Sequence, residues 1–551
     1  MSSPALGGGR RAEPHTDISA RRHWLAAMAA AALALAAYHA AFFDGFQSSD
    51  GANYATVARN LMEGRGLTSS VIQPGLMTQV PTTRRGQAYV TQMPLWPALL
   101  AGWFRLSGAT PLSAVSLAYL FCLAAAGGAW ILGYRFSGRP LGGHLAVALL
   151  LTNPHYVSNV LAVYNVALHS ALMAALFLLL WAPPSLPRAV AVGIVLSLAV
   201  VTREPSIFAL PGVAGCWLAG GPSGTSPPGE GLRARLARVA AYLVVVTAIV
   251  ALALALEKKA VARAAGTAAS PTLHATFLYY TPVLDANWYF SYDDPAMKID
   301  PWRYFAAHPR VLIDKIVFQL RVCFLQQTLL PMQSSVPWFL PILAPWLLPH
   351  GAARRVAAAL LIMLGVLIAM GSITTLHLQY FLAFFPVIQA VVAATVVALL
   401  VRLRSGALRG PRRWVVAAVA AYAVAPIAFN LGRYAAGWRL PTGEYALRPE
   451  QVRTLAQFIV KNTAADAVVV CSHSPLMAWH TRRVIVQYSG SPDYRISNSP
   501  MWHRIDSQVP IDAIVLNSWA NESPDMEVLE GFRMVKAIKT PEVKAWLFRR
   551  Q

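Results

Sequence analysis

Residues Leu25–Phe43 read LAAMAAAALALAAYHAAFF, and residues Phe46–Ser70, which follow almost at once, read FQSSDGANYATVARNLMEGRGLTSS. The first run is long enough to cross the ~30 Å hydrocarbon core of a bilayer as a helix. The second is polar, can form a helix, and begins with a single carboxylate, Asp50. The chain therefore places an acid where it leaves the bilayer.

The composition is typical of a polytopic α-helical membrane protein. Of the 551 residues, 56% are hydrophobic and only 13% are charged, whereas a soluble domain carries about 25% charged residues. Apolar runs recur along most of the chain, and we expect eleven spans: Leu25–Phe43, Leu112–Tyr134, Gly142–Val157, Ala162–Trp181, Ala189–Val201, Ile207–Ala219, Val239–Leu256, Val336–Leu348, Val356–Gly371, Tyr380–Val401 and Val415–Leu431. The expected fold class is thus all-α polytopic, with about 11 transmembrane helices.

The arginines indicate the orientation in the membrane. With eleven spans, one set of arginines falls entirely on one side of the membrane. These arginines lie within residues 10–22, 135–139, 188, 233–238, 354–355 and 402–413. Short basic loops stay in the cytoplasm. Topology then explains the formal net charge of +22, and no nucleic acid is expected as a partner. We expect residues 1–22 to form a disordered cytoplasmic tail. The alternative is a cleavable signal peptide at this end.

Three segments face the other side and are too long to be turns. They are loops 44–110 and 257–335, which interrupt a transmembrane domain spanning residues 23–435, and the tail 440–551. Any chemistry is expected on this face, because the cytoplasmic loops are short. ATP and nucleotides are absent there, so a donor substrate must arrive through the bilayer.

The tail changes character and predicts a small extracytoplasmic α/β domain. Pro449–Asn462 has the pattern of an amphipathic helix. Short β-rich runs, Asp466–Ser472, Arg483–Tyr488 and Asp512–Ser518, are bounded by turn residues. Two further runs near the C-terminus predict a closing hairpin.

The first long loop carries the candidate site. Ser48 and Ser49 can cap a helix whose first turn holds Asp50, where the helix dipole favours a carboxylate. The helix should run to Glu63 and stop at Gly64. A second helix is expected over Pro94–Leu106, which is too short to span and suits the membrane interface. Between the two helices lies a polar stretch with Arg84, Arg85, Tyr89 and Gln92.

These features resemble the GT-C superfamily of membrane glycosyltransferases. The similar members use polyprenyl-phosphate sugars: protein O-mannosyltransferases, aminoarabinose transferases and lipopolysaccharide-core transferases. The resemblance rests on Asp50, on Tyr54 four residues later, and on PLWP at Pro94–Pro97. VVTREPSIFALP (Val200–Pro211) and LHLQYFLAFFPV (Leu376–Val387) resemble further family segments, so that the similarity covers about residues 20–435.

The chain departs from the family pattern at positions that would help to hold a phosphate. Gly51 follows the acid where Glu is common, and Gln379 stands where Arg is usual. Thr91 and Gln92 occupy the place of a Glu-Lys pair in the aminoarabinose transferases. The replacement candidates are Arg84, Arg85 and Arg203.

The resemblance implies transfer of a sugar from a polyprenyl-phosphate-linked donor to a hydroxyl of a glycan, glycolipid or protein. The reaction would occur with inversion, on the periplasmic face of the bacterial inner membrane, without metal or cofactor. Asp50 would act as the general base, a role that contributes typically ~10²–10⁴-fold, and arginine would stabilise the leaving phosphate. The expected substrate-binding residues are Tyr54, Arg84, Arg85, Tyr89, Gln92, Arg203, Glu204, His377, Gln379 and Tyr380.

Other interpretations stay open. Asp50 could serve only to begin a helix, and Asp44 is an alternative base. Asn165 and His169, on one face of a span, favour hydrogen bonds between helices. An alternative enzyme class is a surface-polysaccharide ligase or polymerase. A non-enzymatic transporter of lipid-linked sugar would predict internal repeats and ionisable residues deep within several spans, and neither pattern is found.

Overall fold

A computed structural model describes residues 15–46, 48–73, 77, 82–89, 93–218, 231–265, 301–329, 339–348, 351–373, 378–405, 410–436, 449–488, 505–518, 531–540 and 543–551. Gln92, His377, residues 1–14 of the expected tail and much of the second expected loop lie outside these ranges.

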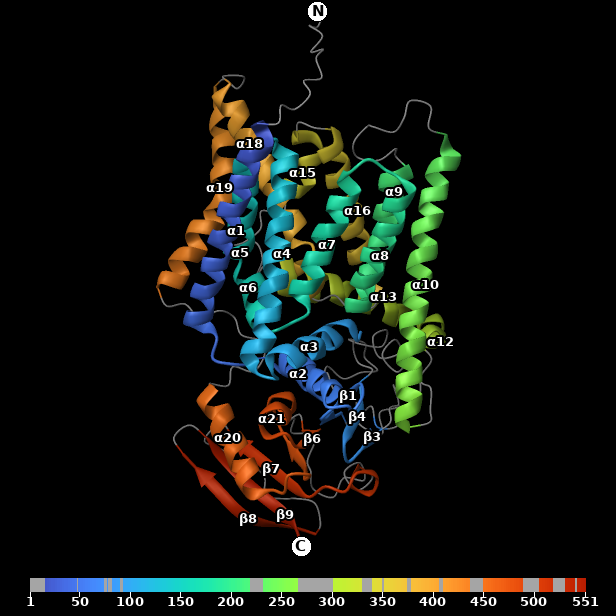
Figure 1. The fold of residues 1–551 in the computed structure, drawn as a ribbon, viewed down its shortest axis with the longest axis vertical. Coiled ribbons are helices and arrows are strands. Elements are labelled where there is room, and N and C mark those ends of the chain that lie inside the picture. The colour runs from blue at the N-terminus through green and yellow to red at the C-terminus, as the bar shows by residue number, and fades with distance from the viewer. Residues whose placement is uncertain are drawn as a thin grey trace, which may run out of the picture.

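The membrane part is a bundle of helices with roughly parallel axes (Figure 1). Its main helices are α1 (His15–Phe42), α4 (Pro111–Ser137), α5 (Pro140–Leu151), α6 (Pro154–Leu161), α7 (Val166–Trp181), α8 (Leu186–Thr202), α9 (Leu210–Leu218), α10 (Leu232–Ala265), α15 (Phe339–Leu347), α16 (Gly351–Ile373), α18 (Phe385–Arg404) and α19 (Pro411–Ala435). Shorter helical pieces are the 3₁₀ segment η2 (Glu204–Ala209), α12 (Pro301–Ala307), α13 (Pro309–Phe318), the π-helical segment η4 (Gln319–Leu329) and α17 (Leu378–Leu382).

The chain is an integral membrane protein, but the count of about eleven spans is not confirmed. Within the described ranges, six helices are long and apolar enough to cross a membrane: α1, α4, α10, α16, α18 and α19. The pair α6 and α7, bent by 120°, would make a seventh if it forms one broken span. Helices α5 and α8 are apolar but have only 12 and 17 residues, where a straight span needs about 20.

The expected span Gly142–Val157 shows why apolar composition misjudges helix lengths. Helix α5 ends at Leu151, and Asn153 begins a new helix, because its side-chain oxygen accepts a hydrogen bond from the Tyr156 amide at 3.0 Å. Pro154 then occupies the first position of α6, where its missing N–H costs nothing. Two polar residues and a proline therefore break an otherwise apolar run.

A layer of short elements from the first loop lies beneath one end of the bundle (Figure 1). It contains α2 (Ser49–Met62), α3 (Leu95–Ser107) and an antiparallel sheet of β1 (Thr68–Ser69), β4 (Gly86–Ala88) and β3 (Thr82–Thr83). Both predicted helices are present, each within one residue of its expected bounds.

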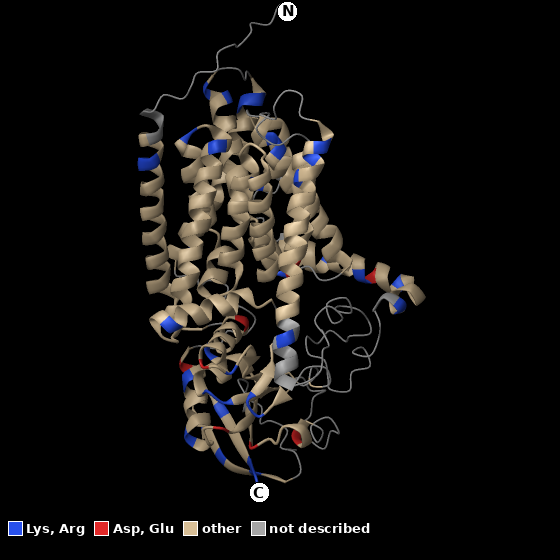
Figure 2. Cartoon of the chain, turned by 45° about the vertical axis from the view of Figure 1, so that its right-hand side comes forward, with Lys and Arg blue, Asp and Glu red and all other residues tan. Residues whose placement is uncertain are grey.

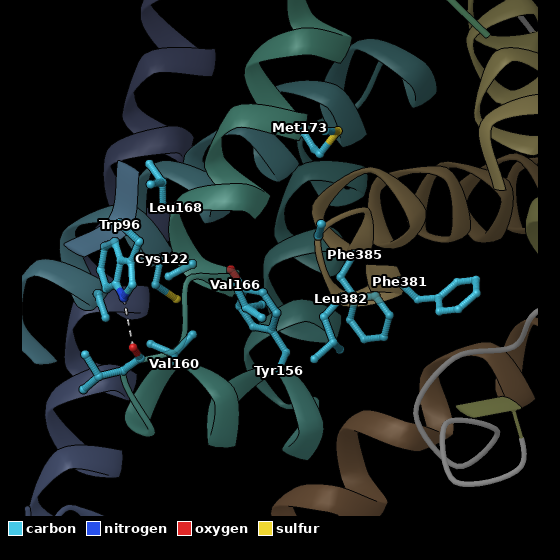
Figure 3. Close-up of a cluster of buried hydrophobic side chains, with 14 of the residues drawn as sticks. Trp96, Cys122, Tyr156, Val160, Val166, Leu168, Met173, Phe381, Leu382 and Phe385 are labelled. Carbon is cyan, nitrogen blue, oxygen red and sulfur yellow. Dashed lines mark hydrogen bonds between the residues drawn. The ribbon is translucent and has the colours of Figure 1, made fainter. Parts of the chain in front are cut away.

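Buried aromatic side chains join this layer to the spans. Trp96 of α3 has no exposed surface and donates its indole N–H to the Val163 carbonyl, in the turn between α6 and α7, at 3.1 Å (Figure 3). On the other side of that turn, Tyr156 stacks on Phe385 of α18, with ring centroids 6.4 Å apart. Helix α3 thus holds the turn that leads into α7, and α6 packs on α18.

The C-terminal unit, by which we mean the described residues from 449 onward, is the expected small α/β fold. It contains α20 (Pro449–Asn462), β5 (Val468–Cys471), α21 (Ser474–Thr481), β6 (Val484–Gln487), β7 (Ala513–Ser518), β8 (Phe532–Lys539) and β9 (Lys544–Arg550). The predicted helix, the three β-rich runs and the closing hairpin are all found.

The sheet of this unit includes a strand from the first loop. Its order is β2-β6-β5-β7-β9-β8, and β2 (Val71–Ile72) pairs in parallel with β6. Strands β6, β5 and β7 are also parallel, whereas β9 and β8 close the sheet as an antiparallel hairpin. The tail and the first loop therefore share one sheet, which the local sequence pattern did not predict.

Lys and Arg residues gather at the end of the bundle remote from the C-terminal unit (Figure 2). Arg135 lies in the last turn of α4, and Arg402 and Arg404 lie in the last turn of α18. This distribution agrees with the expected segregation of short basic loops to one side.

Candidate active site

Asp50 lies in the first turn of α2, as predicted. Ser48 begins the helix in an extended conformation, and its hydroxyl accepts a hydrogen bond from the Gly51 amide at 3.0 Å. The serine, not the aspartate, therefore caps the helix. Asp50 is half-buried and sits in the positive field of the helix N-terminus.

Gly51 is the point of closest approach between α2 and the spans. A Cβ at this position would lie 1.9 Å from the Ala162 carbonyl oxygen, in the turn between α6 and α7. No side chain fits there, and this explains the departure from the family pattern: a glutamate after the acid would collide with backbone. The next residue in the turn, Val163, has a φ of 61°, and Trp96 holds its carbonyl.

Arg203 connects three separate segments beside this turn. It follows α8, donates to the Asn165 side-chain oxygen at 3.0 Å, and donates to the Gln379 side-chain oxygen at 2.6 Å. Its guanidinium carbon also lies 4.7 Å from the ring centroid of Tyr380, a cation–π distance. Gln379, which replaces a family arginine, thus serves as a hydrogen-bond acceptor for the arginine that is present.

The predicted helix-packing roles of Asn165 and His169 are confirmed. The Asn165 side-chain NH₂ donates to the Thr202 carbonyl at 3.1 Å, and the His169 Nε2 lies 2.6 Å from the Ser206 hydroxyl. Asn165 also orients Arg203, so it has a second function that the sequence did not reveal.

Two buried tyrosines lie in the electrostatic field of Asp50 and Arg203. Tyr54 and Tyr89 are 1% and 2% exposed. Burial raises the pKa of both phenols well above the usual value; the Asp50 charge raises it further, and the Arg203 charge opposes the shift. Both groups therefore remain hydrogen-bond donors at neutral pH.

The hydroxyl of Tyr89 has no hydrogen-bond partner among the described residues. A buried hydroxyl left in this state costs about 1–3 kcal/mol. Such a group beside a carboxylate and an arginine is suited to meet a polar ligand.

Glu204 joins the same cluster as the first residue of η2, and its charge and that of Asp50 both act on Arg203. The structure thus brings together seven of the predicted site residues: Asp50, Tyr54, Tyr89, Arg203, Glu204, Gln379 and Tyr380. Gln92 and His377 lie outside the described residues.

Arg84 and Arg85 occupy a different place. They form the turn between β3 and β4, and both are exposed. Arg84 makes an ion pair with Asp512 of the C-terminal unit at 2.6 Å. The ion pair directs Arg84 toward the C-terminal unit.

A further charged residue, Arg59 of α2, is not among the site residues predicted from the sequence. It is 3% exposed and donates to two carbonyls of the C-terminal unit. The signal that could have found it is a lone arginine within the small-residue stretch GANYATVARN. No group of three or more His, Cys, Asp or Glu side chains able to hold a metal ion occurs in the described part of the chain.

Comparison by sequence finds no matching family model and no matching curated protein. Comparison by structure finds several. The apo form of ArnT from Cupriavidus metallidurans has a TM-score of 0.55 and 14% identity, over 96% of this chain and 98% of that one. The same protein bound to undecaprenyl phosphate has a TM-score of 0.54 and 12% identity, over 95% and 97%.

A third similar structure is the archaeal oligosaccharyltransferase AglB from Archaeoglobus fulgidus, in complex with an inhibitory peptide and a dolichol-phosphate. The TM-score is 0.52 and the identity 11%, over 89% of this chain and 69% of that one. At these identities the likeness establishes the fold. The chain thus has the GT-C fold that the resemblance implies.

Proposed function

We propose that this protein transfers a sugar from a polyprenyl-phosphate-linked donor to an acceptor hydroxyl, with Asp50 as the general base. The observation that carries the proposal is the cluster itself. A half-buried carboxylate, an arginine and a buried tyrosine hydroxyl with no hydrogen-bond partner in the described part of the chain meet where the first loop joins the bundle. Similar folds occur in structures that hold undecaprenyl phosphate and dolichol-phosphate.

In the proposed reaction, Asp50 accepts the proton of the acceptor hydroxyl as its oxygen attacks the anomeric carbon. The bond between that carbon and the phosphate oxygen breaks, and polyprenyl phosphate leaves with the electron pair. Attack opposite the leaving group inverts the anomeric centre. Donor and acceptor supply every atom, so no cofactor is required.

Arg203 would stabilise the charge that develops on the leaving phosphate. The guanidinium is fixed by Asn165, Gln379 and the ring of Tyr380, so little reorganisation is needed as the charge grows. Tyr54 and Tyr89, both protonated, would donate hydrogen bonds to the same phosphate or to the sugar. Arg84 and Arg85, on the β3–β4 turn, are placed better to meet an acceptor that approaches past the C-terminal unit.

We infer a non-cytoplasmic location for this site. The short arginine-rich loops gather at the opposite end of the bundle, and such loops stay in the cytoplasm. In a bacterium, the cluster and the C-terminal unit would then face the periplasm from the inner membrane, where donor lipid is reached through the bilayer and the acceptor through water.

The test is a turnover assay with purified protein in detergent. Lipid extract from the source membrane supplies the donor, and mass spectrometry follows the loss of glycosylated polyprenyl phosphate and the gain of free polyprenyl phosphate. Wild type is compared with Asp50→Asn and with Asp44→Asn, whose carboxylate is exposed. We expect Asp50→Asn to abolish conversion and Asp44→Asn to retain it. Full conversion by Asp50→Asn would refute the assignment, and the reverse pattern would transfer the role to Asp44.

A further inference from the structure

Arg59 of α2 binds the end of a helix that lies more than four hundred residues later in the chain. Its two terminal nitrogens donate to the carbonyls of Trp479 at 3.0 Å and Ala478 at 3.1 Å. Both carbonyls belong to the last turn of α21. The last carbonyls of a helix have no partner within it, and the helix dipole favours a cation there. One side chain therefore completes the end of a helix in the C-terminal unit.

The ring of Trp479 strengthens this contact. The Arg59 guanidinium carbon lies 4.7 Å from the ring centroid. The same ring meets Phe46, just before α2, edge-on at 4.9 Å, and Phe104 of α3 at 6.1 Å. Trp479 is thus enclosed by the segments that carry the candidate site. Burial lowers the pKa of Arg59 to about 10, helped by the nearby charge of Arg482, so the guanidinium stays charged at neutral pH.

A second set of contacts ties the polypeptide after α2 to the same unit. Asn60, next to Arg59, donates to the Thr68 carbonyl at 2.9 Å and to the Ser70 hydroxyl at 3.1 Å. The Ser70 carbonyl in turn accepts from the Ile485 amide of β6 at 2.8 Å. The C-terminal half of α2 is therefore fixed by α21 and by the shared sheet, whereas its N-terminal half contacts the spans.

We propose that the C-terminal unit sets the position of the Asp50 carboxylate, and that Arg59 is the positioning residue that transmits it. This inference rests on the proposed function. Asp50 and Arg59 are nine residues apart on one helix, about 13 Å at 1.5 Å per residue. A continuous helix moves as a rod over that length, so release of one end alters the placement of the other. The C-terminal unit is then part of the catalytic machinery although it contributes no reacting group.

The test compares three variants in the turnover assay. Arg59→Gln removes the charge and both donors, and Arg59→Lys keeps the charge. Arg65→Gln is the control, because the side chain of Arg65 is exposed and pairs with Glu63 just after the same helix. We expect Arg59→Gln to lower kcat by about 10- to 100-fold, since displacements of about 1 Å have effects of this size. The KM for the lipid donor should stay within about 2-fold of wild type, because Arg203 is untouched. Arg59→Lys should restore part of kcat, and Arg65→Gln should match wild type.

Hydrogen exchange of the amides of Ser49–Met62, read by mass spectrometry, gives a readout that needs no substrate. Exchange should rise across α2 in Arg59→Gln and stay at the wild-type level in Arg65→Gln. Unchanged kcat and unchanged exchange in a folded Arg59→Gln would overturn the inference. If Arg59→Gln does not fold, Arg59→Lys, which keeps the charge but cannot donate to both carbonyls in a planar fork, must show a selective loss of kcat, and wild-type kcat in that variant would overturn the inference. If wild type itself transfers no sugar while α2 exchange still rises in Arg59→Gln, the positioning stands and the proposed function fails.

Discussion

Replacement of Gly51 by alanine tests how closely the geometry of the cluster must be kept. The added Cβ would lie 1.9 Å from the Ala162 carbonyl oxygen, whereas ordinary contact begins near 3.4 Å. The first turn of α2 and the α6–α7 turn must therefore separate by about 1.5 Å. The α6–α7 turn cannot yield easily, because Trp96 holds the Val163 carbonyl and Asn165 is bonded to Arg203.

Two opposing effects decide the outcome. Alanine is favoured over glycine in a helix by about 1 kcal/mol, but overpacking of this kind costs about 1–3 kcal/mol. Because the atom that the Cβ would meet is backbone, the cost of overpacking should exceed the helix gain, and stability should fall. Activity should fall much more, because Asp50 adjoins the site of the collision and a misplacement of about 1 Å costs about 100-fold. That loss in kcat/KM corresponds to about 2.7 kcal/mol of transition-state stabilisation.

The assay is release of polyprenyl phosphate from lipid donor, with thermal unfolding in the same detergent. Gly102→Ala is the matched control: Gly102 is also helical, on α3, and a Cβ there meets no atom within 4 Å. We expect Gly102→Ala to keep wild-type activity and to unfold at the same temperature or slightly above. If Gly51→Ala keeps more than half of wild-type kcat/KM, the close approach does not position the carboxylate and the reasoning is wrong.

Further substitutions separate binding, catalysis and stability. Arg203→Lys, which lacks the planar fork, should lower kcat/KM by about 10- to 100-fold at an unchanged unfolding temperature; equal kinetics would exclude phosphate contact. Tyr89→Phe removes a buried hydroxyl without a partner in the described structure, so stability should hold or rise while turnover falls; a lower unfolding temperature would mean that the hydroxyl has a protein partner. Burial lowers the pKa of His473 to about 4, whereas the pKa of histidine in an unfolded chain is about 6.5. As the pH falls, the unfolded chain therefore takes up the proton first. The free energy of unfolding then decreases as the pH falls from about 6.5 to about 4. His473→Asn, which tolerates the φ of 56° at this position, should flatten that fall in unfolding temperature, and an identical pH profile would refute the effect.

Local signals predicted the elements that carry the site. Ser48 and Ser49 before an acid, and Gly64 after the last turn, predicted α2, and β-rich runs bounded by turn residues predicted β5, β6 and β7 close to their observed bounds. These features depend on residues within one or two turns, which is the range over which propensity and capping act.

Long-range pairings could not be predicted in the same way. The contact of Arg203 with Gln379 joins positions 176 residues apart, and that of Arg59 with Trp479 joins positions 420 apart. The sequence around Arg203 or Arg59 does not indicate which distant residue each arginine contacts. The same holds for β2, two residues that become a strand only because β6 lies beside them.

Gly51 shows how one residue can be read differently from sequence and from structure. In the sequence, Gly51 stands where a glutamate is common in the family that the chain resembles. In the structure it is the position that lets α2 touch the backbone of the α6–α7 turn. The absence of a side chain is a packing requirement, and only the three-dimensional neighbour, Ala162, reveals it.

The most direct test of the central claim compares the glycans, glycolipids and glycoproteins of cells that lack this protein with those of the same cells complemented by wild type, Asp50→Asn or Asp44→Asn, by mass spectrometry. All three proteins must reach the membrane in equal amounts. We expect wild type and Asp44→Asn to restore one species heavier by a single sugar, and Asp50→Asn not to restore it. Restoration of that species by Asp50→Asn would contradict the assignment of Asp50 as the general base.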